Sequence, residues 1–128
     1  MKILMKDIKK HLADLAYYFE NEDSKISSFH MSYACSNRVH QCGTVACIGG
    51  HVFLMHLGYD ITQPMIVSTS HAYAASRFVD GQTSKKLQKL FYPPFEVDWN
   101  NITPKEAAKA IRNYLKNGDP KWTEVLND

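Results

Sequence analysis

The chain lacks any long apolar run. Its most apolar segment, residues 52–57, is far shorter than the roughly 18 apolar residues that a membrane-spanning helix needs. The first residues contain no continuous apolar stretch of the kind found in export signals, because Lys2, Lys6, Lys9 and Lys10 interrupt them. The sequence therefore predicts a protein of the cytoplasm that makes no contact with a membrane.

Cysteine is scarce and the net charge is small. The three cysteines, Cys35, Cys42 and Cys47, cannot all pair within one chain and include no Cys-x-x-Cys pair, so no disulfide framework is expected. A net charge of +2 over 128 residues does not indicate nucleic-acid binding, which usually requires a clustered basic face. Glycine-rich phosphate loops and paired catalytic carboxylates are also missing, which excludes the signatures of many common enzymes.

The apolar residues that are present recur at helical spacing and predict a mainly α fold. Residues 2–20 form one amphipathic helix, and residues 28–33 alternate in polarity and predict at most a minor extended element. Later helices are expected to begin at Ser70, Thr83 and Thr103, and a short last one after Asp119 and Pro120. We therefore expect one compact domain over residues 1–128, built from five or six helices.

The most buried helix is expected over residues 44–57. Thr44 is a good N-cap, and Gly58 can take the left-handed conformation that ends a helix. Only His51 and His56 are clearly polar inside this segment, and a helix that is apolar on nearly all sides is a central one. We therefore place residues 44–57 at the centre of the domain.

The chain also resembles a group of small bacterial and phage proteins that share a Phe-x-Met segment followed by Cys-Gly-Thr-x-x-Cys-x-x-Gly-His. A Leu-Phe pair and a helix that starts with Thr-Pro come later in these proteins. The resemblance implies a small helical protein, related to phages, and carries no activity. The matching positions are Phe29, Met31, Cys42, Gly43, Thr44, Cys47, Gly50, His51, Leu90, Phe91, Thr103 and Pro104.

The central motif has a structural interpretation, which we favour. Buried cysteine behaves as a small hydrophobic residue, so Cys47 would belong to the core and Cys42 would fill the start of the helix. His51 would be a buried histidine bonded to a backbone carbonyl. The structural motif comprises Cys42, Gly43, Thr44, Cys47, Gly50 and His51.

Two chemical interpretations remain open. Cys35, Cys42, Cys47 and His51 could bind zinc as a Cys3His set, with His40 as a substitute ligand, although no cofactor is required by the sequence. Alternatively Cys42 or Cys47 could be the nucleophile of a papain-like thiol hydrolase, since a helix N-terminus favours the thiolate, with His71 as base. The match to papain-like hydrolases is poor, because their base histidine lies on a strand, whereas the chain beyond Gly58 is predicted to be helical.

An aromatic segment near Pro93 and Pro94 either folds its aromatic side chains back on the core or offers a surface for a partner. Aromatic residues are enriched at interfaces, and the candidates for contact are Phe91, Tyr92, Phe95 and Trp99. The leading hypothesis is accordingly a non-enzymatic protein that binds another macromolecule, a protein rather than a nucleic acid, for example as a modulator or inhibitor of a host protein in the host cytoplasm.

Overall fold

The structure, a computed structural model, describes residues 2–21, 29, 31, 36–40, 43–63 and 65–127; in residues 36–40 and 43–45 only the backbone is described. The mainly helical fold is confirmed. In chain order the elements of the described residues are α1 (Met5–Asn21), β1 (Ser36–His40), β2 (Gly43–Val45), α2 (Ile48–His56), α3 (Thr69–Asp80), α4 (Lys85–Phe91), the 3-10 turn η2 (Trp99–Asn101), α5 (Pro104–Asn117) and α6 (Trp122–Leu126).

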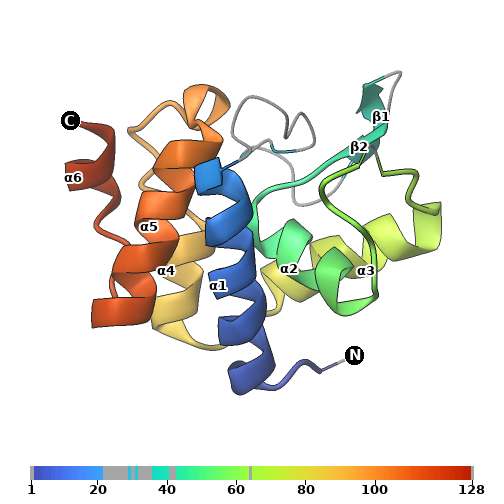
Figure 1. Ribbon diagram of the computed structural model, residues 1–128, viewed down its shortest axis with the longest axis horizontal. Coiled ribbons are helices and arrows are strands. Elements are labelled where there is room, and N and C mark those ends of the chain that lie inside the picture. The colour runs from blue at the N-terminus through green and yellow to red at the C-terminus, as the bar shows by residue number, and fades with distance from the viewer. Residues whose placement is uncertain are drawn as a thin grey trace.

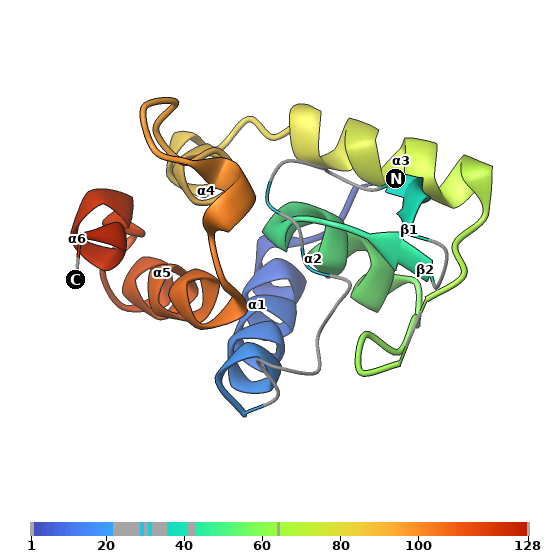
Figure 2. The same cartoon turned by 90° about the horizontal axis from the view of Figure 1, so that it is seen from above.

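Helix α1 lies between two groups of elements. Helices α4, α5 and α6 are on one side of it, and α2, α3 and the hairpin β1–β2 are on the other (Figures 1 and 2). Helix α1 packs against both α5 and α2, although α5 lies far along the chain. Its apolar stripe faces the core through Ile8, Leu12, Leu15, Ala16 and Phe19, all buried. The amphipathic helix predicted over residues 2–20 is therefore α1, which begins three residues later than predicted and leaves Leu4 exposed before it.

Helix α5 begins and ends where the sequence predicts. The Thr103 hydroxyl accepts a hydrogen bond from the Glu106 N–H at 3.2 Å, and the Glu106 carboxylate accepts one from the Thr103 N–H at 2.9 Å. This reciprocal capping box satisfies two backbone donors that the first turn leaves unpaired. Gly118 ends the helix with φ of 74°, a conformation that favours glycine.

The predicted start of the central helix is wrong by four residues. Helix α2 begins at Ile48, and Thr44 lies in β2, which pairs antiparallel with β1. β-branched residues such as Thr44 and Val45 favour extended backbone, and strand pairing satisfies their peptide groups. The helix therefore begins only after Cys47, which is its N-cap. The sequence did not predict this hairpin; in the predicted extended segment, residues 28–33, Phe29 forms an isolated bridge with Ala46.

The rest of the central helix follows the prediction. All residues from Ile48 to Leu54 are buried, and Gly58 has φ of 97° directly after the C-cap. In the predicted extended segment, Met31 is buried and Phe29 packs against the core. Residues 28, 30, 32 and 33 of that segment lie outside the described part of the chain.

The three later helix starts that differ from prediction do so by one or two residues. Ser68 caps α3 in place of Ser70, and Ser84 caps α4 in place of Thr83. Helix α6 begins after Lys121, while the Asp119 carboxylate accepts a hydrogen bond from the Lys121 N–H in the turn before it. For α3 and α4, neighbouring residues compete to cap the same helix, and the local sequence does not rank them. The N-cap of α6 is Lys121, which has φ of 53° and makes no side-chain capping hydrogen bond.

Candidate functional site

Cys47 is the N-cap of the buried helix α2. Its side chain is 2% exposed, and its Sγ accepts a hydrogen bond from the Gly50 N–H at 3.5 Å. Burial raises the pKa of the Cys47 thiol to about 11, so the thiol stays protonated at neutral pH. A buried, protonated thiol that caps a helix has a structural role and is a poor nucleophile.

This geometry predicts an order of stability for two variants. Cys47→Ser keeps a side-chain acceptor for the Gly50 N–H, and serine is a preferred N-cap, whereas Cys47→Ala removes the cap and leaves a small cavity. We expect losses in the free energy of unfolding of about 1 kcal/mol for Cys47→Ser and about 2 kcal/mol for Cys47→Ala. Urea unfolding at pH 7 measures both. A serine variant less stable than the alanine variant would contradict the capping role.

His51 lies one turn further along α2 and is fully buried. Its Nδ1–H donates to the Cys47 carbonyl oxygen at 2.9 Å, an oxygen that also accepts the backbone N–H of His51 at 2.9 Å. The imidazole ring packs against Phe19 and Phe29, with centroid distances of 5.6 and 6.2 Å. Burial lowers the pKa of His51 to about 4, so the ring is neutral at pH 7.

The predicted zinc set is only partly within the described residues. Cys35 and Cys42 lie outside them, and of His40 only the backbone is described. In the described part of the chain, no three or more His, Cys, Asp or Glu side chains are grouped so as to bind a metal ion. The Cys47 sulfur accepts a hydrogen bond from the Gly50 N–H, and His51 Nδ1–H donates to the Cys47 carbonyl oxygen. The four-ligand set stays a prediction.

The predicted thiol-hydrolase set is also only partly within the described residues. Cys42 lies outside the described residues, and Cys47 is buried with its sulfur bonded to Gly50. His71 is exposed in the first turn of α3, where its Nδ1 and the Tyr59 hydroxyl are hydrogen-bonded at 2.7 Å. Cys47 and His71 therefore have separate partners and separate surroundings, and a base within reach of the thiol is what such catalysis requires.

The aromatic segment forms a well-braced loop, which we call the aromatic loop, residues 92–99. The Tyr92 hydroxyl donates to the Asp80 carboxylate on α3, and the Trp99 Nε1–H donates to the Pro94 carbonyl oxygen at 3.0 Å. The Val97 N–H donates to the same carbonyl oxygen at 3.2 Å and closes a turn over residues 94–97. Burial, together with the Asp80 carboxylate, keeps the pKa of Tyr92 well above its usual range. The loop is thus held from both ends.

The four predicted contact residues have very different exposures. Phe95, at the turn of the aromatic loop, is 93% exposed, and Tyr92 is 38% exposed. Trp99 is half-buried, with its ring centroid 6.3 Å from that of Tyr92. Phe91 is 1% exposed and packs in the core, so its prediction as a contact residue is wrong. It is the last residue of α4, and the helical stripe that includes Leu87 and Leu90 turns it inward.

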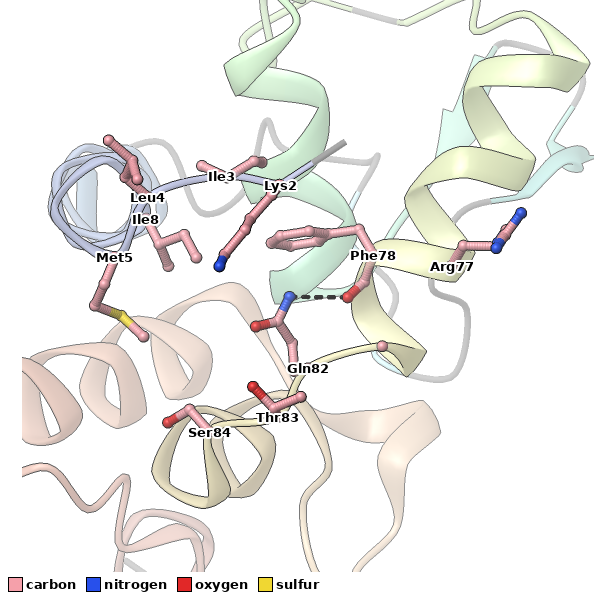
Figure 3. A pocket seen from close by; sticks show the side chains of 11 residues that line it. Lys2, Ile3, Leu4, Met5, Ile8, Arg77, Phe78, Gln82, Thr83 and Ser84 are labelled. Carbon is pink, nitrogen blue, oxygen red and sulfur yellow. Dashed lines mark hydrogen bonds between the residues drawn. The ribbon is translucent and has the colours of Figure 1, made fainter.

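Two hollows in the surface were not predicted. One, of about 390 Å³, lies beside the aromatic loop, where Tyr92 and Pro94 meet Trp122 and the turn before α6. The other, of about 470 Å³, lies between residues 2–5, the end of α3 and the connection from α3 to α4. Figure 3 shows Lys2, Met5 and Gln82 around this second hollow, with the Gln82 amide donating to the Phe78 carbonyl oxygen. Each hollow joins segments that are distant in sequence, which is why no local pattern indicates it.

A pair of histidines was also missed. His11 on α1 and His56 at the end of α2 approach each other, with 3.1 Å between His11 Nε2 and His56 Nδ1. Their rings meet edge to face, with centroids 5.3 Å apart. His11 is half-buried and His56 is exposed. Burial and the neighbouring His56 lower the pKa of His11.

Comparison with known proteins gives no relative to guide the assignment. No protein-family model matches the chain. No curated protein and no solved structure matches it. The described helices include none that is long and apolar enough to cross a lipid bilayer.

Proposed function

We propose that this protein is not an enzyme and that it acts by binding another protein through the aromatic loop, with Phe95 as the main contact. The observation that carries the proposal is the 93% exposure of Phe95 on a loop that is otherwise held in place. A large aromatic side chain in water loses the favourable transfer free energy that burial would give it. Contact with a partner would recover that free energy.

The bracing of the loop makes it suited to binding. The hydrogen bonds from Tyr92 to Asp80 and from Trp99 to Pro94 fix the backbone on both sides of Phe95. A surface that is already ordered loses little conformational entropy when a partner binds. The hollow formed with Trp122 lies next to the loop and could receive an apolar side chain of the partner.

The cellular context of this proposal comes from the sequence alone. The resemblance to small bacterial and phage proteins suggests a phage-related protein that works in the cytoplasm of its host. A modulator or inhibitor of a host protein would fit that setting. An exposed aromatic residue on a fixed loop is the kind of feature that such a protein requires.

Phe95→Ala tests the proposal against a matched control. Ile66→Ala removes another side chain that is almost fully exposed, at 90%, from the segment before α3 on the other side of the molecule (Figure 2). Partners captured from a cytoplasmic extract would be identified, purified and titrated by calorimetry. We expect Phe95→Ala to weaken binding by about 2 kcal/mol, roughly thirtyfold, and Ile66→Ala to leave the affinity within about twofold.

Two results would count against the proposal. Equal affinity of the Phe95→Ala variant and the unaltered protein for the purified partner would place the interface elsewhere. Turnover of a substrate by the purified protein would show that it is an enzyme.

A further inference from the structure

We propose that His11 and His56 form a binding site for a divalent transition-metal ion of the nickel, copper and zinc group, which joins α1 to α2. The site is separate from the aromatic loop, and it shares no residue with the Cys3His set predicted from the sequence. It rests on the approach of two imidazole nitrogens from residues that are 45 positions apart in the chain.

The distance between the two nitrogens suits a shared ion. Imidazole nitrogens bind zinc at about 2.0–2.1 Å, so two ligand nitrogens 3.1 Å apart correspond to a nitrogen–metal–nitrogen angle of about 100°. That angle lies between the right angle of square-planar or octahedral sites and the wider tetrahedral angle. The spacing of the two nitrogens therefore requires no displacement of either helix, but each ring must turn so that its lone pair is directed at the ion and not at the other nitrogen.

The scaffold presents both ligands from helices. His11 lies in the middle of α1, and His56 is the last residue of α2. The two helices pack against each other through the core. Sites built on packed helices are more precise than sites on loops, because the backbone is already fixed. A bound ion would cross-link α1 and α2.

The charges around His11 also favour a cation. Asp14 and Asp7 lie on α1 close enough to act on the ring of His11, and Lys10 is the neighbouring positive charge. Burial and His56 hold the pKa of His11 below its ordinary value of 6.5, so the ring is neutral at pH 7, which is the form that binds a metal. In the described chain no third His, Cys, Asp or Glu completes the site, so water would fill the other positions.

Metal binding requires one rearrangement of protons. In the hydrogen-bonded pair one of the facing nitrogens carries a hydrogen and the other accepts it. The donor ring must change tautomer, so that its proton moves to its outer nitrogen and both facing nitrogens present lone pairs. Imidazole suits nickel, copper and zinc, whereas magnesium and calcium prefer oxygen ligands. We therefore expect no binding of Mg²⁺ or Ca²⁺ at this pair.

Titration of the full chain with Ni²⁺ at pH 7.5, followed by calorimetry and thermal melting, tests the proposal. We expect one saturable site, a raised melting temperature with Ni²⁺, and at least tenfold weaker binding in His11→Gln and in His56→Gln. His71→Gln is the matched control, because His71 is also exposed and hydrogen-bonded through its ring. It should retain the full affinity. Lowering the pH to 5.5 should weaken binding, since protonated imidazole cannot bind a metal.

Nuclear magnetic resonance of the ring nitrogens gives a second measurement that needs no substitution. Added Zn²⁺ should shift His11 Nε2 and His56 Nδ1 and leave the ring of His71 unchanged. The proposal fails if neither resonance moves, or if Ni²⁺ binds equally well to both histidine variants. The latter result would assign the metal to other ligands, such as the cysteines, and would leave the role of Phe95 untouched.

Discussion

Lowering the pH from 7 to 4 is expected to reduce the free energy of unfolding by about 3 kcal/mol through His51 alone. The pKa of His51 is about 4 in the folded protein, against an ordinary value of 6.5. Between those two values the unfolded chain binds a proton that the folded chain does not. Stability is therefore complete above about pH 6.5 and is lost as the pH falls toward 4.

The physical cause of this loss is the surroundings of the ring. His51 is fully buried against Phe19 and Phe29, and its Nδ1–H is directed at the Cys47 carbonyl. A second proton would place a charge in an apolar core, which is costly. Urea unfolding at several values between pH 7 and pH 4 measures the effect.

His51→Phe is the variant that isolates this contribution. The Cys47 carbonyl still accepts the backbone N–H of residue 51, so the substitution leaves it with a partner. We expect the variant to lose most of the dependence on pH between 6.5 and 4. His11→Gln is the control, because the pKa of His11 is also lowered but its ring is half-exposed. Equal stability of the unaltered protein at pH 7 and pH 4 would contradict the burial of a neutral His51.

Gly49→Val is expected to reduce the free energy of unfolding by about 3 kcal/mol. A Cβ at position 49 would lie 2.8 Å from Val79 Cγ2 and 3.0 Å from Phe91 Cδ2. Both neighbours are buried, and the branched side chain of Val79 has little freedom to move away. Overpacking of the core therefore outweighs the gain that a residue other than glycine brings to a helix.

Two further variants make this prediction specific. Lys85→Val introduces the same side chain into the first turn of α4, where Lys85 is exposed, and should change stability by less than about 0.5 kcal/mol. Val79→Ala combined with Gly49→Val should recover part of the loss, because the closest clashing atom is removed. Denaturant unfolding of the unaltered protein, Gly49→Val, Val79→Ala and the double variant measures the coupling. Losses that simply add in the double variant would show that Val79 is not the cause.

Local signals explain which parts of the fold could be predicted. Helices α1 and α5 follow from apolar spacing and from the capping box of Thr103 and Glu106, which involve residues close in sequence. Strand β2 was not predicted, because only its pairing with β1 identifies it as a strand. Thr44 by itself suits either a helix N-cap or a strand. Phe91 fits two predictions, the inward face of the helix that contains Leu87 and Leu90 and an exposed aromatic segment, and its burial confirms the first.

The candidate sites could be predicted only in part. The bond from His51 to a backbone carbonyl follows from a polar residue within an apolar helix, and Phe95 was identified as an exposed aromatic. The approach of His11 to His56 depends on how α1 packs against α2, which neither helix indicates by itself. The hollow beside the aromatic loop likewise needs Trp122 from the end of the chain.

The position of α1 between the two groups of helices has a consequence for synthesis of the chain. Helix α1 is made before α5, with which it packs most extensively, and α5 emerges from the ribosome only after residues 22–103. Until then the apolar stripe of α1 lacks its main cover, although α2 can shield part of it. Contacts so distant in sequence slow folding and expose apolar surface to aggregation and to chaperones. The core can therefore be completed only once α5 has been made.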